Sequence, residues 1–546
     1  MLGQQISRRS FLSITAMAAA AVALDWRKIE ALASGMGPKE DYPAVIIGAG
    51  LGGLCCAAYL AKQGIPVTVL EKHDIPGGYA TAFDRAGGKF SFEVSLEGTA
   101  VKGDAIGRML QNLGIMDKLD FVALPEAYRV GTGDKEIVFP QRDPEALIQE
   151  LGKRFPQEAT GIRGFIQEVL DICEETHAYA PRSRLLKTLL KPIFPLQYPR
   201  MWAVRNKTLA DLLDGYVKDA EVRGILSAMW PYYGLPPSKL SGFYYAVATG
   251  GYLKNGSYYI KDRSQALSDL LAETIERAGG KVLCETEATQ ILIEQGAVKG
   301  VRTASGDVLP ARAVVSNASA LHTFRNMLPS NAVPETYRQK LSSYRPSISC
   351  FIVWLGLNRE LRGTVPWYST GVGSGQGAEA DYLSCLKGEV ETCSFGVTLY
   401  DTLYKGYSSP GTSTMKLICL SGYEPWRKFE ADYRAGNKGA YHREKDRWTD
   451  ILIRRTEEQL IPGLGSMIEV KEAGTPLTCW RYTGNTEGAI YGFEQSMDNA
   501  FMNRINNRTP VKGLYLASAW GNPGGGYGGV LRAGEMTFEQ IMEDWS

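Results

Sequence analysis

Ala44-Val45-Ile46-Ile47-Gly48-Ala49-Gly50-Leu51-Gly52-Gly53 is the stretch that decides the fold of this chain. Its first four residues are apolar and predict a buried strand, and the glycines that follow predict a turn. The next segment, Leu54 to Gln63, contains neither proline nor glycine and predicts a helix. A second apolar strand, Pro66 to Leu70, ends in Glu71. Strand, glycine turn, helix, strand and acid in this order predict a dinucleotide-binding unit.

Each of four residues in this unit has its own physical task. Gly48 permits the tight turn, Gly50 lets a pyrophosphate approach the backbone, and Gly53 lets helix and strand pack closely. The N-terminus of the helix offers free N–H groups to the phosphates. Glu71, at the tip of the second strand, can accept hydrogen bonds from a ribose diol. A turn that binds nothing is the alternative interpretation.

The composition is that of an ordinary globular protein. Of 546 residues, 44% are hydrophobic and 22% are charged, and the net charge is +1. A charge balance so close to neutral gives no indication of nucleic-acid binding. The nine cysteines include no Cys-x-x-Cys pair, and there are four histidines. We therefore predict no metal site, because ligands with the usual spacing are missing.

The first 33 residues have the pattern of a twin-arginine signal peptide. Ser7-Arg8-Arg9-Ser10-Phe11-Leu12 is followed by a mildly apolar stretch to Leu24, and Ala31-Leu32-Ala33 is a candidate cleavage site. We predict export by the twin-arginine route, to the periplasm or the outer face of the cytoplasmic membrane, with peripheral attachment. Cleavage of the signal stays open. The alternative is an N-terminal helix with two incidental arginines.

A second glycine-rich stretch, Ala519 to Val530, lies between a short apolar strand, Leu514 to Ala517, and a closing helix. Its glycines would let the backbone approach a flat ligand with no Cβ in the way. The helix that begins near Gly528 would direct its partial positive charge at that ligand. A flexible loop is the alternative interpretation.

Taken in order, these motifs resemble those of the FAD-dependent phytoene desaturase, carotenoid isomerase and retinol saturase family. The resemblance spans residues 42–540 and rests on the first glycine turn, Pro76-Gly77-Gly78, the strand meander near Ala288, Tyr482-Thr483-Gly484, Gly488 to Gly492, and Gly513 to Gly529. One departure is Tyr79, because many members of that family carry arginine after the glycine pair. A cofactor contact at this position is therefore in doubt.

The resemblance implies FAD as the cofactor and gives residues a place around it. Glu71 would hold the adenosine ribose, the backbone at Ala288 would meet the adenine, and Gly528 to Val530 would meet the pyrimidine side of the flavin. The full set of expected cofactor residues is Gly48, Gly50, Leu51, Gly52, Gly53, Glu71, Lys72, Gly77, Gly78, Ala288, Trp520, Gly528, Gly529 and Val530.

The implied fold is α/β, with an FAD-binding Rossmann-like domain of the glutathione reductase type and an inserted α+β substrate domain. Nucleotide-binding elements lie at both ends and in the middle of the chain, while residues 104–178 look mainly helical. We therefore expect one FAD domain assembled from residues 42–105, 251–330 and 506–546. A helical, membrane-facing part would take residues 106–250, and the sheet and helices of the substrate domain residues 331–505.

The segment 182–207 is basic and aromatic. Seven basic residues and no acidic one lie between 176 and 210: Arg182, Arg184, Lys187, Lys191, Arg200, Arg205 and Lys207. Phe194, Tyr198 and Trp202 interleave with them, and this predicts contact with a membrane surface. The solvated face of a helical lid is the alternative. The aromatic groups Trp230 to Tyr233 and Phe243 to Tyr245 are candidates for a tunnel lining or for plain core.

The implied activity is that of an FAD oxidoreductase acting on a carbon–carbon bond of an apolar, isoprenoid or polyene lipid. The reaction would be desaturation, saturation or cis–trans isomerisation, by hydride transfer at flavin N5. Tyr482, Thr483 and Tyr491 are the expected substrate-side residues, with core tyrosines as the alternative. Export favours quinone or oxygen as electron acceptor, because NAD(P)H is not expected outside the cytoplasm. A flavin amine oxidase and a non-catalytic prenyl or lipid carrier are the competing hypotheses.

Overall fold

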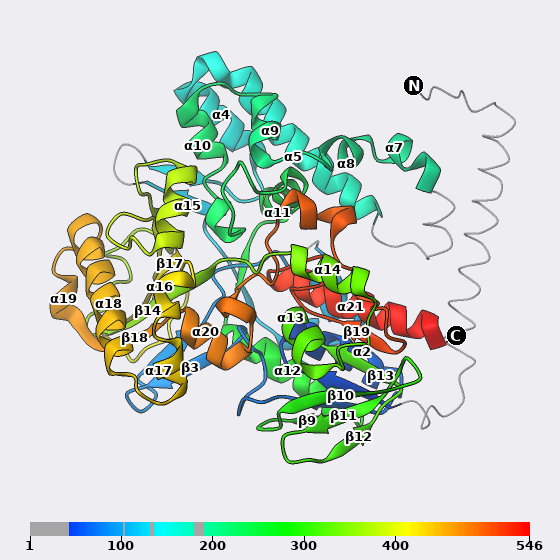
Figure 1. The fold of residues 1–546 in the computed structure, drawn as a ribbon. Helices are drawn as coiled ribbons and strands as arrows, with labels where there is room; N and C mark the ends of the chain where they lie inside the picture. Colours follow the sequence, from blue (N-terminus) through cyan, green and yellow to red (C-terminus); the bar gives the residue numbers. More distant parts are fainter. Residues whose placement is uncertain (1–42, 102–103, 132–135, 180–190, 546) are drawn as a thin grey trace, which may run out of the picture.

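The computed structural model describes residues 43–101, 104–131, 136–179 and 191–545, and the twin-arginine segment lies outside this part (Figure 1). The first glycine turn belongs to a five-stranded parallel sheet. The sheet contains, in spatial order, β9 (Lys281–Leu283), β2 (Val67–Leu70), β1 (Ala44–Ile47), β13 (Ala313–Ser316) and β19 (Leu514–Leu516). β1 has the bounds expected from the sequence. The predicted α/β fold is confirmed, with strands drawn from three separated stretches of chain; the domain boundaries stay a prediction.

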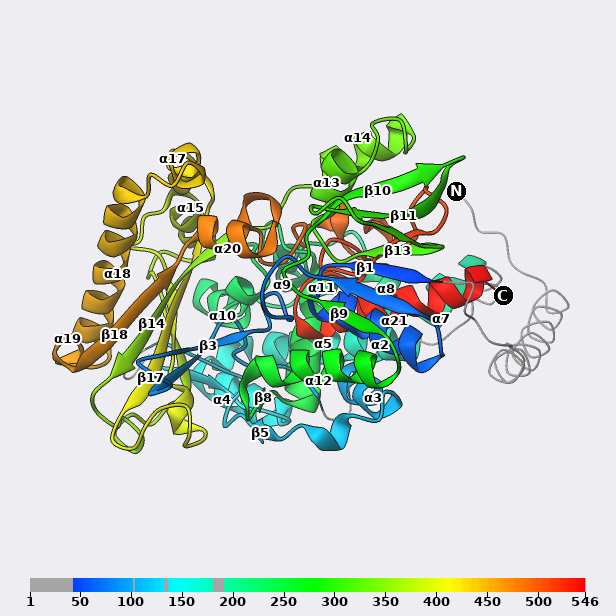
Figure 2. The ribbon, with the colours of Figure 1, turned by 90° about the horizontal axis from the view of Figure 1, so that it is seen from below.

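The parallel sheet is covered by helices on one face and by a strand meander on the other (Figure 2). Ala44 and Ile46 of β1 pack with α2 (Leu51–Lys62), while Val45 and Ile47 pack with the meander. Because β1 is buried on both faces, it is continuously apolar rather than alternating. The helical layer also contains α12 (Arg263–Arg277) and α21 (Tyr527–Trp545), and the meander consists of β10 (Ala288–Glu294), β11 (Ala297–Thr303) and β12 (Val308–Pro310).

A seven-stranded mixed sheet forms the core of the substrate half. Its spatial order is β18 (Ile468–Gly474), β14 (Ser349–Leu357), β17 (Ser413–Ser421), β16 (Phe395–Thr398), β15 (Ser369–Val372), β6 (Tyr128–Val130) and β7 (Ile137–Phe139). All nine residues of β14 are buried. Phe351 packs with α18 (Gly439–Gln459) on one face, and Trp354 packs with β4 (Phe90–Glu93) on the other.

The helices between residues 144 and 255 pack around apolar side chains that are continuous with the core of the seven-stranded sheet. They include α4 (Pro144–Arg154), α5 (Ala159–Tyr179), α8 (Pro199–Val204), α9 (Leu209–Asp214), α10 (Ala220–Leu226) and α11 (Gly242–Asn255). Residues 104–178 are mainly helical, as expected, and the exceptions are β5 (Phe121–Ala123), β6 and β7. β5 pairs with β8 (Tyr258–Ile260), and the other two join the large sheet. Apolar runs this short carry no periodicity, so their distant partners decide their state.

No helix of the described chain combines the length and the apolar character that a membrane span requires.

Candidate functional site

The first glycine turn leaves no space for side chains. Gly48 has a φ of +93°, a value that favours glycine. A Cβ on Gly53 would lie 2.4 Å from the carbonyl oxygen of Gly48, and one on Gly50 would lie 2.4 Å from Asn317 Oδ1. α2 begins at Leu51, and its N-cap Gly50 has no side chain that could accept from the first-turn N–H groups. These groups are therefore available to a phosphate.

Glu71 lies directly after β2 and faces this turn. The residue is 8% exposed, and its carboxylate accepts the N–H of Ala49 on Oε2 at 2.7 Å and the N–H of His73 on Oε1 at 2.9 Å. Each oxygen retains a lone pair for another donor, such as a ribose hydroxyl. Lys72 points away, and its Nζ donates to the carbonyl oxygen of Arg481 at 3.1 Å.

The second glycine turn packs against the first. Gly77 has a φ of +128°, and its N–H donates to the carbonyl oxygen of Ala49 at 2.8 Å. Tyr79, which stands where many family members carry arginine, donates its hydroxyl to the carbonyl oxygens of Gly488 and Ala489 at 3.4 and 3.3 Å. Burial raises the pKa of Tyr79 well above its usual value. Its hydroxyl is thus a neutral donor that holds this segment in place.

The C-terminal glycine cluster, Gly524 to Gly529, reaches the same site from the other end of the chain. Gly524 and Gly526 have φ values of +132° and +80°. A Cβ on Gly525 would lie 2.9 Å from the carbonyl oxygen of Tyr491, whereas one on Gly526 would meet nothing within 4 Å. The cluster leads into α21, so the positive end of that helix dipole faces the site.

One cavity of about 2420 Å³ joins these parts. Of the expected cofactor residues, thirteen line it; the exception is Gly53, which packs beneath the turn. Ligand sites usually occupy about 300–1,000 Å³, so this cavity has room for a dinucleotide and for a second molecule. The glycine-lined walls, the uncapped helix N-terminus and the free lone pairs of Glu71 fit FAD.

Aromatic side chains line the part of the cavity beyond the glycine cluster, and we call this part the aromatic half. α11 turns one face toward it with Tyr244, Ala248, Gly251 and Tyr252. Residues 230–233 and Phe243 also line it, but Tyr245 is buried in the core and donates its hydroxyl to the carbonyl oxygen of Leu226. The far end is lined by Tyr179, Phe194, Tyr198 and Trp202.

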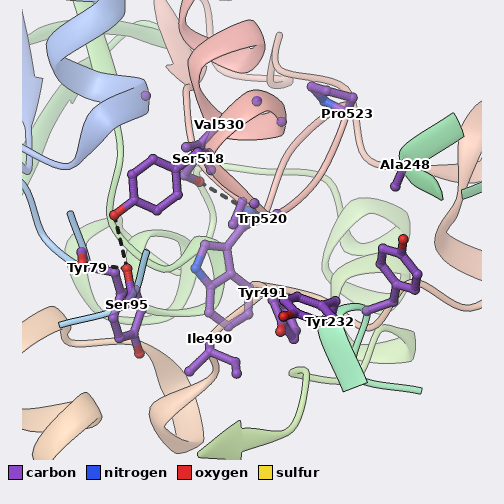
Figure 3. Close-up of a pocket in the computed structure, with 18 of the residues that line it drawn as sticks. Tyr79, Ser95, Tyr232, Ala248, Ile490, Tyr491, Ser518, Trp520, Pro523 and Val530 are labelled. Carbon is purple, nitrogen blue, oxygen red and sulfur yellow. Dashed lines mark hydrogen bonds between the residues drawn. The ribbon is translucent and has the colours of Figure 1, made fainter. Parts of the chain in front are cut away.

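The structure separates the three expected substrate-side residues. Tyr491 lies between Trp520 and Tyr232, facing the cavity from the side opposite Tyr79 (Figure 3). Its hydroxyl donates to the carbonyl oxygen of Pro231 at 3.2 Å. Tyr482 is 46% exposed, and its ring lies edge-on to His73 with centroids 5.0 Å apart.

Tyr482 is therefore at the Glu71 end of the cavity and not beside the glycine cluster, where it was expected to face the flavin. Thr483 also lines the cavity, but its hydroxyl donates to the carbonyl oxygen of Cys479, within its own helix α20 (Pro476–Thr483). Tyr491 is the one of the three whose position matches the expectation.

Sequence reasoning missed a charged group in the aromatic half. Glu97 lines the cavity and accepts the hydroxyl of Tyr232 on Oε2 at 2.7 Å. Its Oε1 lies 3.4 Å from Nζ of Lys416, whose side chain is 1% exposed. The Tyr368 hydroxyl donates to the Glu97 backbone carbonyl. These residues are far apart in the chain, and no local pattern brings them together.

The basic segment differs from the expected membrane-facing surface. Residues 180–190, with three of its basic residues, lie outside the described chain. Arg200 forms ion pairs with Glu168 and Asp171. Phe194 and Tyr198 are buried, so they cannot enter a lipid surface, whereas Leu196 is 73% exposed. Contact with a membrane stays a prediction.

Comparisons with known proteins follow the same motifs. Residues 44–346, more than half of the chain, match the family described as FAD dependent oxidoreductase. The human all-trans-retinol 13,14-reductase is 27% identical, with 87% of this chain and 82% of that protein aligned. The prolycopene isomerase of Daucus carota is 26% identical (93% and 81%), and so is the neurosporene-forming phytoene desaturase of Rhodobacter capsulatus (92% and 94%). The predicted resemblance is confirmed.

Among solved structures, the cyclohexylamine oxidase of Brevibacterium oxydans aligns with a TM-score of 0.59. The alignment covers 92% of this chain and 99% of that one at 16% identity. At this identity the likeness shows the fold alone.

Proposed function

The chain belongs to the FAD dependent oxidoreductase family, its cofactor is FAD, and from this premise we propose that it acts on a carbon–carbon bond of an apolar polyene lipid. The observation that carries the proposal is the single cavity in which the glycine-lined walls continue into the aromatic half. A long apolar molecule in the aromatic half would lie end-on to the glycine cluster. Relatives named for retinol, prolycopene and phytoene support a substrate of this class.

FAD, when bound, supplies the two-electron chemistry. The protein positions the substrate, surrounds it with apolar side chains and provides a group that can accept or donate a proton. Tyr232, Tyr244 and Tyr491 line the aromatic half and direct their hydroxyls into hydrogen bonds with Glu97, Gly525 and Pro231. The hydroxyls are thereby satisfied, so these three side chains offer apolar surface to the lipid. An apolar lipid that filled this part would displace water from it.

Glu97 is the group we propose for proton handling. Tyr232 and Lys416 fix its carboxylate at the edge of the aromatic half, and Oε2 can take a proton from a substrate carbon or return one. Glu97→Gln keeps the shape and the hydrogen bond from Tyr232 but removes this capacity. We expect lipid turnover to fall about 10²–10⁴-fold with FAD still bound, the usual contribution of general acid–base catalysis. Glu276→Gln, on the exposed side of α12, is the matched control.

The test of the function is anaerobic mixing of the FAD-loaded protein with defined polyenes, followed by mass analysis of the lipid. Loss of two hydrogens with bleaching of the flavin indicates desaturation, gain of two hydrogens after prior reduction indicates saturation, and an unchanged mass with altered polyene absorbance indicates isomerisation. Bleaching by amines with no change in any polyene would overturn the proposal in favour of an amine oxidase. A protein that binds polyenes but changes none of them would be a carrier.

We also propose, from residues 1–33, export by the twin-arginine route, and with it quinone or oxygen as electron acceptor. Replacement of Arg8 and Arg9 by lysine should retain the protein in the cytoplasm of its host, as judged by cell fractionation. Reoxidation of the reduced protein by a soluble quinone or by oxygen, but not by NADP⁺, is the expected result for the acceptor.

A further inference from the structure

Arg504 is a buried cation beside the C-terminal glycine cluster. Its side chain is 5% exposed and lines the cavity. Within the described chain, every hydrogen bond from its guanidinium goes to a backbone carbonyl or side-chain amide oxygen, and none goes to a carboxylate. Burial lowers the pKa of Arg504 to about 10, so its guanidinium is still charged at neutral pH. The site therefore contains a full positive charge with no ionic partner.

The guanidinium also holds the loop that precedes the cluster. Its Nε donates to the carbonyl oxygen of Gly521 and its Nη2 to that of Ala519. Its Nη1 donates to Gln495 Oε1 at 2.8 Å and to the Asn499 carbonyl oxygen at 3.1 Å. Every acceptor is neutral, so the hydrogen bonds fix the cation without cancelling its charge.

The cation lies directly against glycine backbone. A Cβ on Gly524 would be 3.2 Å from the Arg504 guanidinium carbon. We expect this cluster to form the wall against the bound flavin, and Gly524, Gly525 and Gly526 place no side chain between the cation and that wall. Arg504 is buried, and a charge in a low-dielectric interior acts over longer distances than one in solvent.

We propose that Arg504 is a positioning residue that sets the charge at the flavin end of the cavity. It holds residues 519–521 in the shape that receives the flavin, and its unpaired charge stabilises the more negative, reduced form of the cofactor. This role concerns the bound FAD alone, so it can be tested without knowing the lipid substrate. The quantity to measure is the two-electron reduction potential in the absence of any substrate.

Gln495→Glu tests the charge without touching the arginine. The new carboxylate would stand in the place of Gln495 Oε1, 2.8 Å from Nη1, and would neutralise the cation while keeping the hydrogen bond. We expect at least a tenfold fall in the equilibrium constant for two-electron reduction, about 30 mV. Gln459→Glu, exposed at the end of α18, adds the same charge far from the cavity and should change the constant less than threefold.

Variants of Arg504 separate charge from position. Arg504→Lys keeps the charge but loses the fork of hydrogen bonds, so we expect weaker retention of FAD with the equilibrium constant within threefold of the parent. Arg504→Met loses both and should show the tenfold fall as well. The proposal is overturned if Gln495→Glu leaves the equilibrium constant within threefold or expels FAD, or if the lysine variant shifts it as far as the methionine variant. Should the methionine variant not fold, the Gln495→Glu result decides alone.

Discussion

Replacing Glu71 with glutamine tests how the adenosine end of the cavity binds FAD. In the parent, one carboxylate oxygen accepts the N–H of Ala49 and the other that of His73. Glutamine offers one acceptor oxygen and one amide NH₂, so one of the two backbone N–H groups would face another donor. The amide also removes the negative charge and one of the two acceptors offered to the ribose diol.

The expected loss follows from the contacts that disappear. A hydrogen bond to a charged group contributes about 1.5–3 kcal/mol, and 1.4 kcal/mol is a factor of ten in a dissociation constant. Loss of one such bond to the ribose therefore weakens FAD binding roughly 10–150-fold. The assay is titration of the apoprotein with FAD, in which binding is measured by the quenching of flavin fluorescence. Glu276→Gln is again the control, and a less than threefold effect of Glu71→Gln would refute this assignment of Glu71.

Three other predictions concern stability. Glu93 is fully buried, and its carboxylate accepts five hydrogen bonds, of which a glutamine amide would lose at least two. Glu93→Gln should therefore lower the free energy of unfolding, measured in urea, by about 3–6 kcal/mol, and a loss under 1 kcal/mol would contradict this. Gly53→Ala should destabilise the protein and lower its FAD content, while Gly224→Ala, whose Cβ meets nothing within 4 Å, should do neither; equal melting temperatures for the two would oppose the close-packing argument. Burial raises the pKa of Asp381, so the folded state takes up a proton at a higher pH than the unfolded chain. The stability of the parent relative to Asp381→Asn should therefore increase as the pH falls from 7 to 4, and a difference that does not change with pH would be the contrary result.

The parts that the sequence predicts well are those with local signals. β1, the first glycine turn and Glu71 lie within a short stretch, and each residue type has a physical task that its neighbours confirm. The C-terminal glycine cluster can also be predicted from the sequence, because a glycine-rich stretch between a strand and a helix has few alternatives to a turn or loop. The close contact between the two glycine turns, from Gly77 to Ala49, could not be derived from spacing alone.

The parts that sequence reasoning missed depend on distant contacts. Glu97 and Lys416 meet because β17 brings a buried lysine to the end of the segment that follows β4, and neither residue belongs to a recognisable motif. Tyr482 is an expected substrate-side residue, but α20 places it at the Glu71 end of the cavity. Phe194 and Tyr198 look like interfacial aromatics in sequence, yet they pack against Tyr179.

The central claim is that one cavity holds FAD in its glycine-lined part and an apolar lipid in its aromatic half. Ala248 lines the aromatic half on α11, and Figure 3 shows it on the side of the pocket opposite Tyr79. The decisive measurement is the anaerobic conversion of a polyene by the parent and by Ala248→Trp, each with oxidised and with previously reduced flavin, and with FAD content determined for both. Conversion is followed by flavin absorbance near 450 nm and by the mass and absorbance of the polyene. We predict full FAD content in both proteins, conversion of the polyene by the parent, and little or none by the variant. Conversion by the variant at the parental rate would show that the lipid reaches the flavin by another way and would contradict the account.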